Sequence, residues 1–181
     1  MKNKLTLSIC IVIIGLSFSS CSRKISFNTE VRNRVAATNT SLTKLQYYVD
    51  RNVELKRVVS SGETKVSSGT IKVENGKSIQ IIKLKRNTPG VCTAIAGDKL
   101  SISFEAEDSK SLVFVMPRTG NIKSSYVLQL ASIDKNNNAT VNYGGTVYQV
   151  SPNGIFAKLK VKKSVATKVN VKKSKMKGRK L

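Results

Sequence analysis

The chain has 181 residues, with 32 lysines and arginines against 10 aspartates and glutamates, so its net charge at pH 7 is +22. This length allows one ordinary domain with a real core, and an apolar fraction of 40% is too high for disorder throughout. The absence of histidine excludes Ser-His-Asp and Cys-His catalysis and the commonest zinc sites, while the charge predicts attraction to polyanions.

The first twenty residues have the composition of an export signal. Lys2 and Lys4 precede a mostly apolar run of 14 residues from Leu5 to Phe18. A membrane-spanning helix needs about 20 apolar residues, so this run is too short to span and instead fits the hydrophobic region of a signal peptide. Small serines then lead to Cys21. The whole segment resembles the bacterial lipoprotein signal.

This resemblance implies that residues 1–20 are a signal peptide and that Cys21 is the lipid attachment site. In such proteins the cysteine is acylated on sulfur, the chain is cut just before it, and the new amine is usually acylated as well. Ser22 resembles the outer-membrane sorting type, which implies an outer-membrane protein that faces the periplasm. An ordinary secretory signal cut near Ser19 and an uncleaved anchor are the alternatives.

The cysteines have different expected fates. Cys10 leaves with the signal peptide and Cys21 carries lipid, so no intrachain disulfide is expected in the mature chain. Cys92 lies in a predicted strand and is expected to be a small buried hydrophobe. It is not expected to be a nucleophile, because no histidine can serve as its base.

A lipidated tether is expected over residues 21–41, and it includes a short helix over Thr29–Thr40. Asn28 or Thr29 is the expected N-cap of that helix. Its apolar residues form only a narrow stripe.

From Leu42 onward, apolar and polar residues alternate, which is typical of strands that are buried on one face. Asn75-Gly76, Gly97-Asp98 and Gly144-Gly145 predict tight hairpins between such strands. The alternation slips at Ile81-Ile82, so that strand either is buried on both faces or contains a bulge. About ten short strands are expected, the last over Ile155–Val161. They predict an all-β domain over residues 42–161, either an antiparallel sandwich or a small barrel.

A basic tail is expected over residues 162–181, within a segment that has eleven basic residues and no acidic ones after Ala157. Like charges repel, so the tail is expected to be disordered until it meets an anionic partner. The candidate polyanion contacts are Lys162, Lys163, Lys172, Lys173, Lys175, Lys177, Arg179 and Lys180. Lipid headgroups, acidic glycans and acidic proteins are the candidate partners, and a solvated tail without a single partner is the alternative. Nucleic acid is not favoured, because the tail lacks aromatic residues that stack on bases.

Three further patterns bear on chemistry. Glu105, Glu107 and Asp108 form the one tight acidic cluster in the sequence. Glu105 and Glu107 on one strand face would suit glycoside hydrolysis, but pairing with lysines at a sheet edge is favoured.

Asp134–Asn138 begins like a calcium loop but lacks the glycine and the final glutamate of such a loop, so an Asn-rich turn is expected. Exposed aromatic side chains can bind a glycan or peptide, and the candidates are Tyr47, Tyr48, Tyr143 and Tyr148. By strand alternation, about half of these four tyrosines should instead lie in the core.

These features predict a non-enzymatic, lipid-anchored envelope protein without a cofactor. Its β domain serves binding or structure, and its tail contacts an anionic surface. The competing hypotheses are an enzyme that acts on cell-wall glycans through Glu105 and Glu107, and an unexported nucleic-acid-binding protein.

Overall fold

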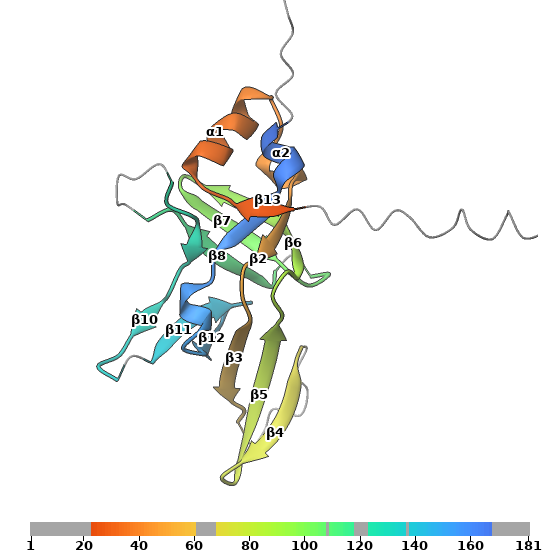
Figure 1. Ribbon diagram of the computed structural model, residues 1–181. Helices are drawn as coiled ribbons and strands as arrows, with labels where there is room; N and C mark the ends of the chain where they lie inside the picture. The colour runs from red at the N-terminus through yellow and green to blue at the C-terminus, as the bar shows by residue number, and fades with distance from the viewer. Residues whose placement is uncertain (1–22, 61–67, 108, 118–122, 137, 168–181) are drawn as a thin grey trace, which may run out of the picture.

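The computed structural model describes residues 23–60, 68–107, 109–117, 123–136 and 138–167. They form thirteen strands in two antiparallel sheets, with two short α-helices (Figure 1). This arrangement confirms the predicted all-β class. The sheets do not close into a barrel within the described residues, so the sandwich is the observed alternative.

The first sheet has seven strands and carries both ends of the described chain. Its order is β1 (Lys24–Ser26), β13 (Leu159–Lys162), β2 (Gln46–Val49), β6 (Pro89–Ala96), β7 (Lys99–Ser103), β8 (Ser111–Val115) and β9 (Val127–Leu128). Near β1 and β13 lie α1 (Thr29–Ala37), the short α2 (Lys163–Thr167) and the 3₁₀ turn η2 (Leu42–Lys44) (Figure 1).

The second sheet has six strands. Its order is β10 (Ser132–Ile133), β11 (Ala139–Tyr143), β12 (Thr146–Val150), β3 (Val53–Val58), β5 (Lys77–Leu84) and β4 (Thr70–Glu74). The chain crosses between the sheets from β2 to β3 and from β5 to β6. These crossings are tied together, since the amide of Asn87 donates to the Val49 carbonyl at 2.9 Å and that of Arg86 to Asn52 Oδ1 at 2.8 Å.

All three predicted hairpins form where the sequence places their turns. Asn75 and Gly76 join β4 to β5 with φ of 50° and 72°, and Gly144 and Gly145 join β11 to β12 with φ of 58° and 77°. Gly97 joins β6 to β7 with φ of 57°. Positive φ suits the right-handed twist of the flanking strands, and glycine or asparagine adopts it at little cost.

The slip at Ile81-Ile82 marks a strand that is buried on both faces. Ile81 and Ile82 are both buried, and β5 pairs with β3 and β4 without a register shift. The bulge lies instead in β6, between Cys92 and Ala94. Cys92 itself is buried, as predicted, and burial raises the pKa of its thiol.

One core cluster joins the two sheets and α1. Within this cluster, the centre of the Phe27 ring lies 5.2 Å from the ring centres of both Tyr47 and Tyr126, and the Phe27 ring is edge-on to Tyr47. Tyr47, Tyr48, Tyr143 and Tyr148 are all buried. The prediction that about half of these tyrosines remain exposed is therefore wrong.

The expected tether is part of the packed structure. β1 pairs with β13, Phe27 is fully buried, and α1 buries Val31 and Val35. Asn28 caps α1, as predicted, although the helix ends at Ala37 rather than Thr40. The fold therefore includes Lys24 onward instead of beginning at residue 42.

The expected boundaries at the other end also move. The 3₁₀ turn η3 (Gly154–Phe156) precedes β13, so the last strand begins at Leu159 rather than Ile155. Lys162 belongs to β13, and α2 follows with Ala166 buried, so residues 162–167 are folded rather than part of a disordered tail. None of the helices in the described part of the chain is long and apolar enough to cross a membrane.

Candidate polyanion-binding face

The strand β13 turns its apolar residues toward the core and its lysines away from it. Leu159 and Val161 are fully buried, whereas Lys162 is exposed and Lys160 is partly exposed. Lys158 immediately precedes the strand and is also exposed. Because side chains alternate along a strand, these three lysines project from one side of the sheet.

Pairing with β1 adds a fourth lysine. Lys24 lies directly opposite Lys162, and Ser26 lies opposite Lys160, whereas Ile25 lies opposite the buried Val161. We define the lysine face as Lys24, Lys158, Lys160 and Lys162. α1 packs on the core with Val161, so the lysine face is on the other side of this part of the sheet.

Tyr48 forms the floor of the lysine face. It lies opposite Lys160 in the register of β13 and β2, and the Lys24 ammonium is 4.4 Å from the centre of its ring. Although Tyr48 points away from the core, it is only 8% exposed. Long lysine side chains can cover apolar surface with their methylenes while their charges stay in water, and a cation over a tyrosine ring is favourable.

The charge of the lysine face has no acidic counterpart among the described ion pairs. The acidic side chains in those pairs bind other cations: Glu30 with Arg34, Asp50 with Arg51, Glu54 with Lys56 and Lys83, Asp98 with Arg32, and Glu105 and Glu107 with Lys110. Asp50 comes nearest in the register, but its carboxylate accepts from the Lys158 backbone amide at 2.7 Å and from Arg51. The face therefore presents net positive charge to solvent.

Both ends of the described chain meet at this edge of the sheet. The amide of Lys163, at the start of α2, donates to the carbonyl of Arg23 at 2.8 Å. Figure 1 shows β1 beside β13, with α2 next to them. Cys21 lies outside the described residues, but it precedes Arg23 by only two positions.

Only part of the predicted contact set can be placed. Lys162 and Lys163 are both exposed, at the end of β13 and the start of α2. The other predicted contacts lie outside the described residues: Lys172, Lys173, Lys175, Lys177, Arg179 and Lys180. The sequence prediction missed Lys24, because its position depends on pairing between the two ends of the chain. Lys158 and Lys160 had a detectable signal in the alternation of lysine with Leu159 and Val161.

The acidic cluster has a different geometry from that expected. β7 ends at Ser103, so Glu105 and Glu107 lie in the loop that follows and do not share a strand face. Both pair with Lys110, whose Nζ lies 3.7 Å from Glu105 and 3.0 Å from Glu107. The hydrogen bond to Glu107 raises the pKa of Lys110. The predicted pairing of these glutamates with a lysine is confirmed. The prediction that Glu105 and Glu107 share a strand face is wrong. Asp108 lies outside the described residues.

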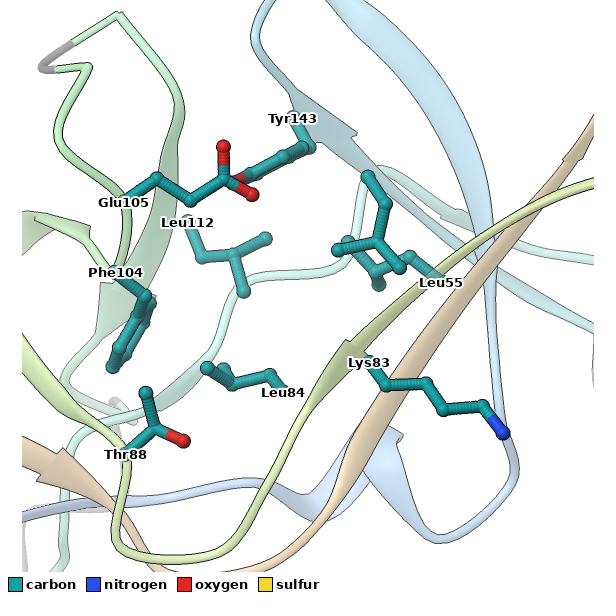
Figure 2. Close-up of a pocket in the computed structure, with 9 residues that line it drawn as sticks. Leu55, Lys83, Leu84, Thr88, Phe104, Glu105, Leu112 and Tyr143 are labelled. Atoms are coloured by element: carbon teal, nitrogen blue, oxygen red, sulfur yellow. The ribbon is translucent and has the colours of Figure 1, made fainter. Parts of the chain in front are cut away.

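A small apolar pocket lies beside this cluster, where the two sheets meet. Figure 2 shows Leu55 and Leu84 on one side and Phe104 and Leu112 on the other, with Glu105 next to the Tyr143 ring. Burial and a hydrogen bond with Glu105 raise the pKa of Tyr143. The pocket holds about 110 Å³, less than ordinary small-molecule sites, and Glu105 is the one acidic residue among its described lining. This geometry does not place two carboxylates across a substrate cleft.

The Asn-rich segment forms the expected turn between β10 and β11. Asp134 Oδ1 accepts from the amides of Asn136 and Asn138 at 2.9 and 2.7 Å. Hydrogen bonds from Asn138 lower the pKa of Asp134. In the described part of the chain, no group of three or more potential metal-ligating side chains comes together.

Comparison with protein-family models, curated proteins and solved structures found no match for this chain. The proposed function therefore rests on the lysine face and on residues 1–21.

Proposed function

We propose that this protein is a lipid-anchored component of the bacterial envelope, attached through Cys21 to the outer membrane and facing the periplasm. Its β domain serves a binding or structural role rather than catalysis. The lysine face and the basic residues that follow Thr167 give it affinity for anionic lipid, glycan or protein surfaces. The resemblance of residues 1–21 to a lipoprotein signal supports the anchor.

The observation that supports the polyanion role is the lysine face, whose four lysines have no acidic partner among the described ion pairs and lie at the edge of the sheet where Lys163 meets Arg23. Lys24 and Lys162 lie directly opposite each other, an arrangement that costs stability because like charges repel. An anionic surface against these side chains relieves that repulsion. Two acyl chains make membrane attachment lasting, whereas a single chain holds a protein only weakly.

Incorporation of labelled palmitate into the full chain tests the anchor. We expect the wild type to be labelled and the Cys21→Ser variant to be unlabelled. Cys92→Ser is the matched control, because Cys92 is buried and should not carry lipid. Equal labelling of the wild type and Cys21→Ser would refute the proposed anchor.

A further inference from the structure

We propose that the lysine face docks on anionic phospholipid headgroups of the same leaflet that holds the anchor. This inference rests on the proposed lipidation of Cys21 and names the partner of the lysine face. It also fixes which side of the β domain meets the membrane.

The reach of the chain brings the lysine face close to the headgroups. Lys24 is three residues from Cys21, and a fully extended chain spans about 3.6 Å per residue, so the two lie within about 11 Å. The Debye length at physiological ionic strength is about 8 Å. Even a fully extended linker is therefore only slightly longer than one Debye length, so the anchor keeps Lys24 close to the range in which the potential of an anionic leaflet acts, and β1–β13 pairing places Lys162 beside it.

The shape of the lysine face suits a flat partner. Along β13, alternate residues are about 7 Å apart, and the neighbouring strand β1 is about 5 Å away. The lysines project from the side of the sheet opposite α1 and the core. Their long side chains can thus reach one plane together without moving the backbone.

Exposed apolar residues continue this side of the sheet. Pro89 lies opposite Tyr48, and Val91, which is 45% exposed, lies opposite Gln46. Their register places both on the outward side, beside the lysines. Cations next to apolar side chains match the boundary between headgroups and acyl chains.

A membrane is favoured over a free acidic glycan or protein because the anchor acts as a short tether. Tethering makes contact between the lysine face and the leaflet intramolecular, with a high effective concentration. A soluble polyanion gains nothing from the position of Cys21. Arg23, two residues after Cys21, contacts Lys163, the residue after Lys162. The tether therefore raises the effective concentration of the leaflet at the lysine face.

Residue-resolved acetylation of lysines tests this inference on the full lipidated chain. The protein is reconstituted in phosphatidylcholine vesicles with or without phosphatidylglycerol, reacted with a water-soluble reagent, and analysed by mass spectrometry. We expect phosphatidylglycerol to slow acetylation of Lys24, Lys160 and Lys162 about fivefold or more, the scale set by the attraction of one lysine to an anionic leaflet. The protection should disappear near 1 M salt, where the Debye length falls to about 3 Å.

The same molecule supplies the matched control. Lys72, Lys77 and Lys135 are exposed on the second sheet or its turns, and the β4–β5 hairpin extends from the end of the molecule opposite α1 (Figure 1). Their acetylation should be unaffected by phosphatidylglycerol. Equal protection of both sets would overturn the inference. Protection by a soluble acidic polysaccharide but not by phosphatidylglycerol would also overturn it, in favour of a glycan.

A charge reversal separates docking from a local change in reactivity. Lys160→Glu should reduce the protection of Lys24 and Lys162, while Lys77→Glu should leave it intact. If both variants keep full protection, docking through this face is wrong. The mass of the N-terminal peptide in the same samples identifies the other failure: an unacylated Cys21 refutes the proposed function, whereas acylated Cys21 without selective protection refutes only the docking.

Discussion

At the residue scale, Gln80 shows how this core accepts a polar side chain. It is 1% exposed, and its amide nitrogen donates to the Ser68 carbonyl at 2.5 Å. Its carbonyl oxygen accepts from Arg57 Nε at 2.6 Å and from the Tyr148 hydroxyl at 3.1 Å. A buried amide that is bonded at both ends avoids the cost of desolvated, unpaired polar atoms.

Replacing Gln80 should therefore be more costly than removing one of its partners. Gln80→Leu leaves the Ser68 carbonyl and the Tyr148 hydroxyl without their hydrogen bonds to Gln80, and we expect it to lower the free energy of unfolding by about 2–3 kcal/mol. Tyr148→Phe removes one donor and should cost about 1 kcal/mol. Urea unfolding measures both variants, and a Gln80→Leu protein as stable as the wild type would show that this network contributes nothing.

Tyr47 gives the molecule a predictable sensitivity to alkali. Its side chain is fully buried and its hydroxyl donates to the Leu42 carbonyl at 3.0 Å. Burial raises the pKa of Tyr47 well above its ordinary value of 10.0. Above about pH 10 the unfolded chain loses this proton while the folded chain keeps it, so stability falls as pH rises.

The Tyr47→Phe variant isolates that effect from other groups that titrate in alkali. Up to about pH 9 the stability difference between wild type and variant should be constant. Above about pH 10 the wild type should lose about 1.4 kcal/mol per pH unit relative to the variant. Urea unfolding across this range measures it, and parallel pH profiles for the two proteins would show that Tyr47 ionises normally when folded.

At the element scale, local signals were sufficient for much of the fold. Asn75-Gly76 and Gly144-Gly145 specify their turns through positive φ, and Asn28 specifies the start of α1 through its side chain. The β1–β13 pair has no such local signal, because residues 24–26 find their partners at 160–162. A segment of three residues next to a proposed lipid anchor resembles a tether until that distant partner is known.

The same reasoning applies to the candidate site. The alternation of Lys160 and Lys162 with Leu159 and Val161 indicates outward lysines, although the sequence prediction did not use it, and it could not show that Tyr48, also outward, lies buried beneath them. Lys24 of β1 lies over the Tyr48 ring, and Lys160 of β13 lies opposite Tyr48 in the register. The lysine face became visible only when the first and last strands were brought together.

The N-cap of α1 is a test of one local signal. Asn28 Oδ1 accepts from the Val31 amide at 2.9 Å. Asn28→Ala should lower the free energy of unfolding by about 1 kcal/mol, whereas Asn28→Asp keeps the acceptor and should cost much less. Thermal or urea unfolding can compare the two variants. Equal losses would indicate that the backbone of Asn28, rather than its cap, fixes the helix start.

At the scale of the whole molecule, charge is distributed unevenly along the chain. Residues 168–181 hold seven basic and no acidic residues, and they follow directly on the element beside the lysine face. We therefore expect the proposed lipid anchor, the lysine face and this segment to act on the same anionic surface. The second sheet carries its own ion pairs, such as Glu54 with Lys56 and Lys83.

If the basic tail contacts polyanions, its charges should count for more than equal charges elsewhere. We expect Lys172→Gln/Lys173→Gln/Lys175→Gln to lower the salt concentration at which the full chain leaves an anionic column. The control Lys72→Gln/Lys77→Gln/Lys135→Gln removes the same charge from the second sheet and its turns and should shift elution less. Equal shifts for the two variants would favour a solvated tail without a specific role.

The proposed lipid attachment at Cys21 underlies the membrane role of the lysine face, and the mass of the mature N-terminal peptide tests it most directly. For protein purified from the envelope of a bacterial host, we predict a peptide that begins at Cys21 and carries two or three acyl chains. A peptide that begins elsewhere, or an unmodified Cys21, would contradict the proposed anchor.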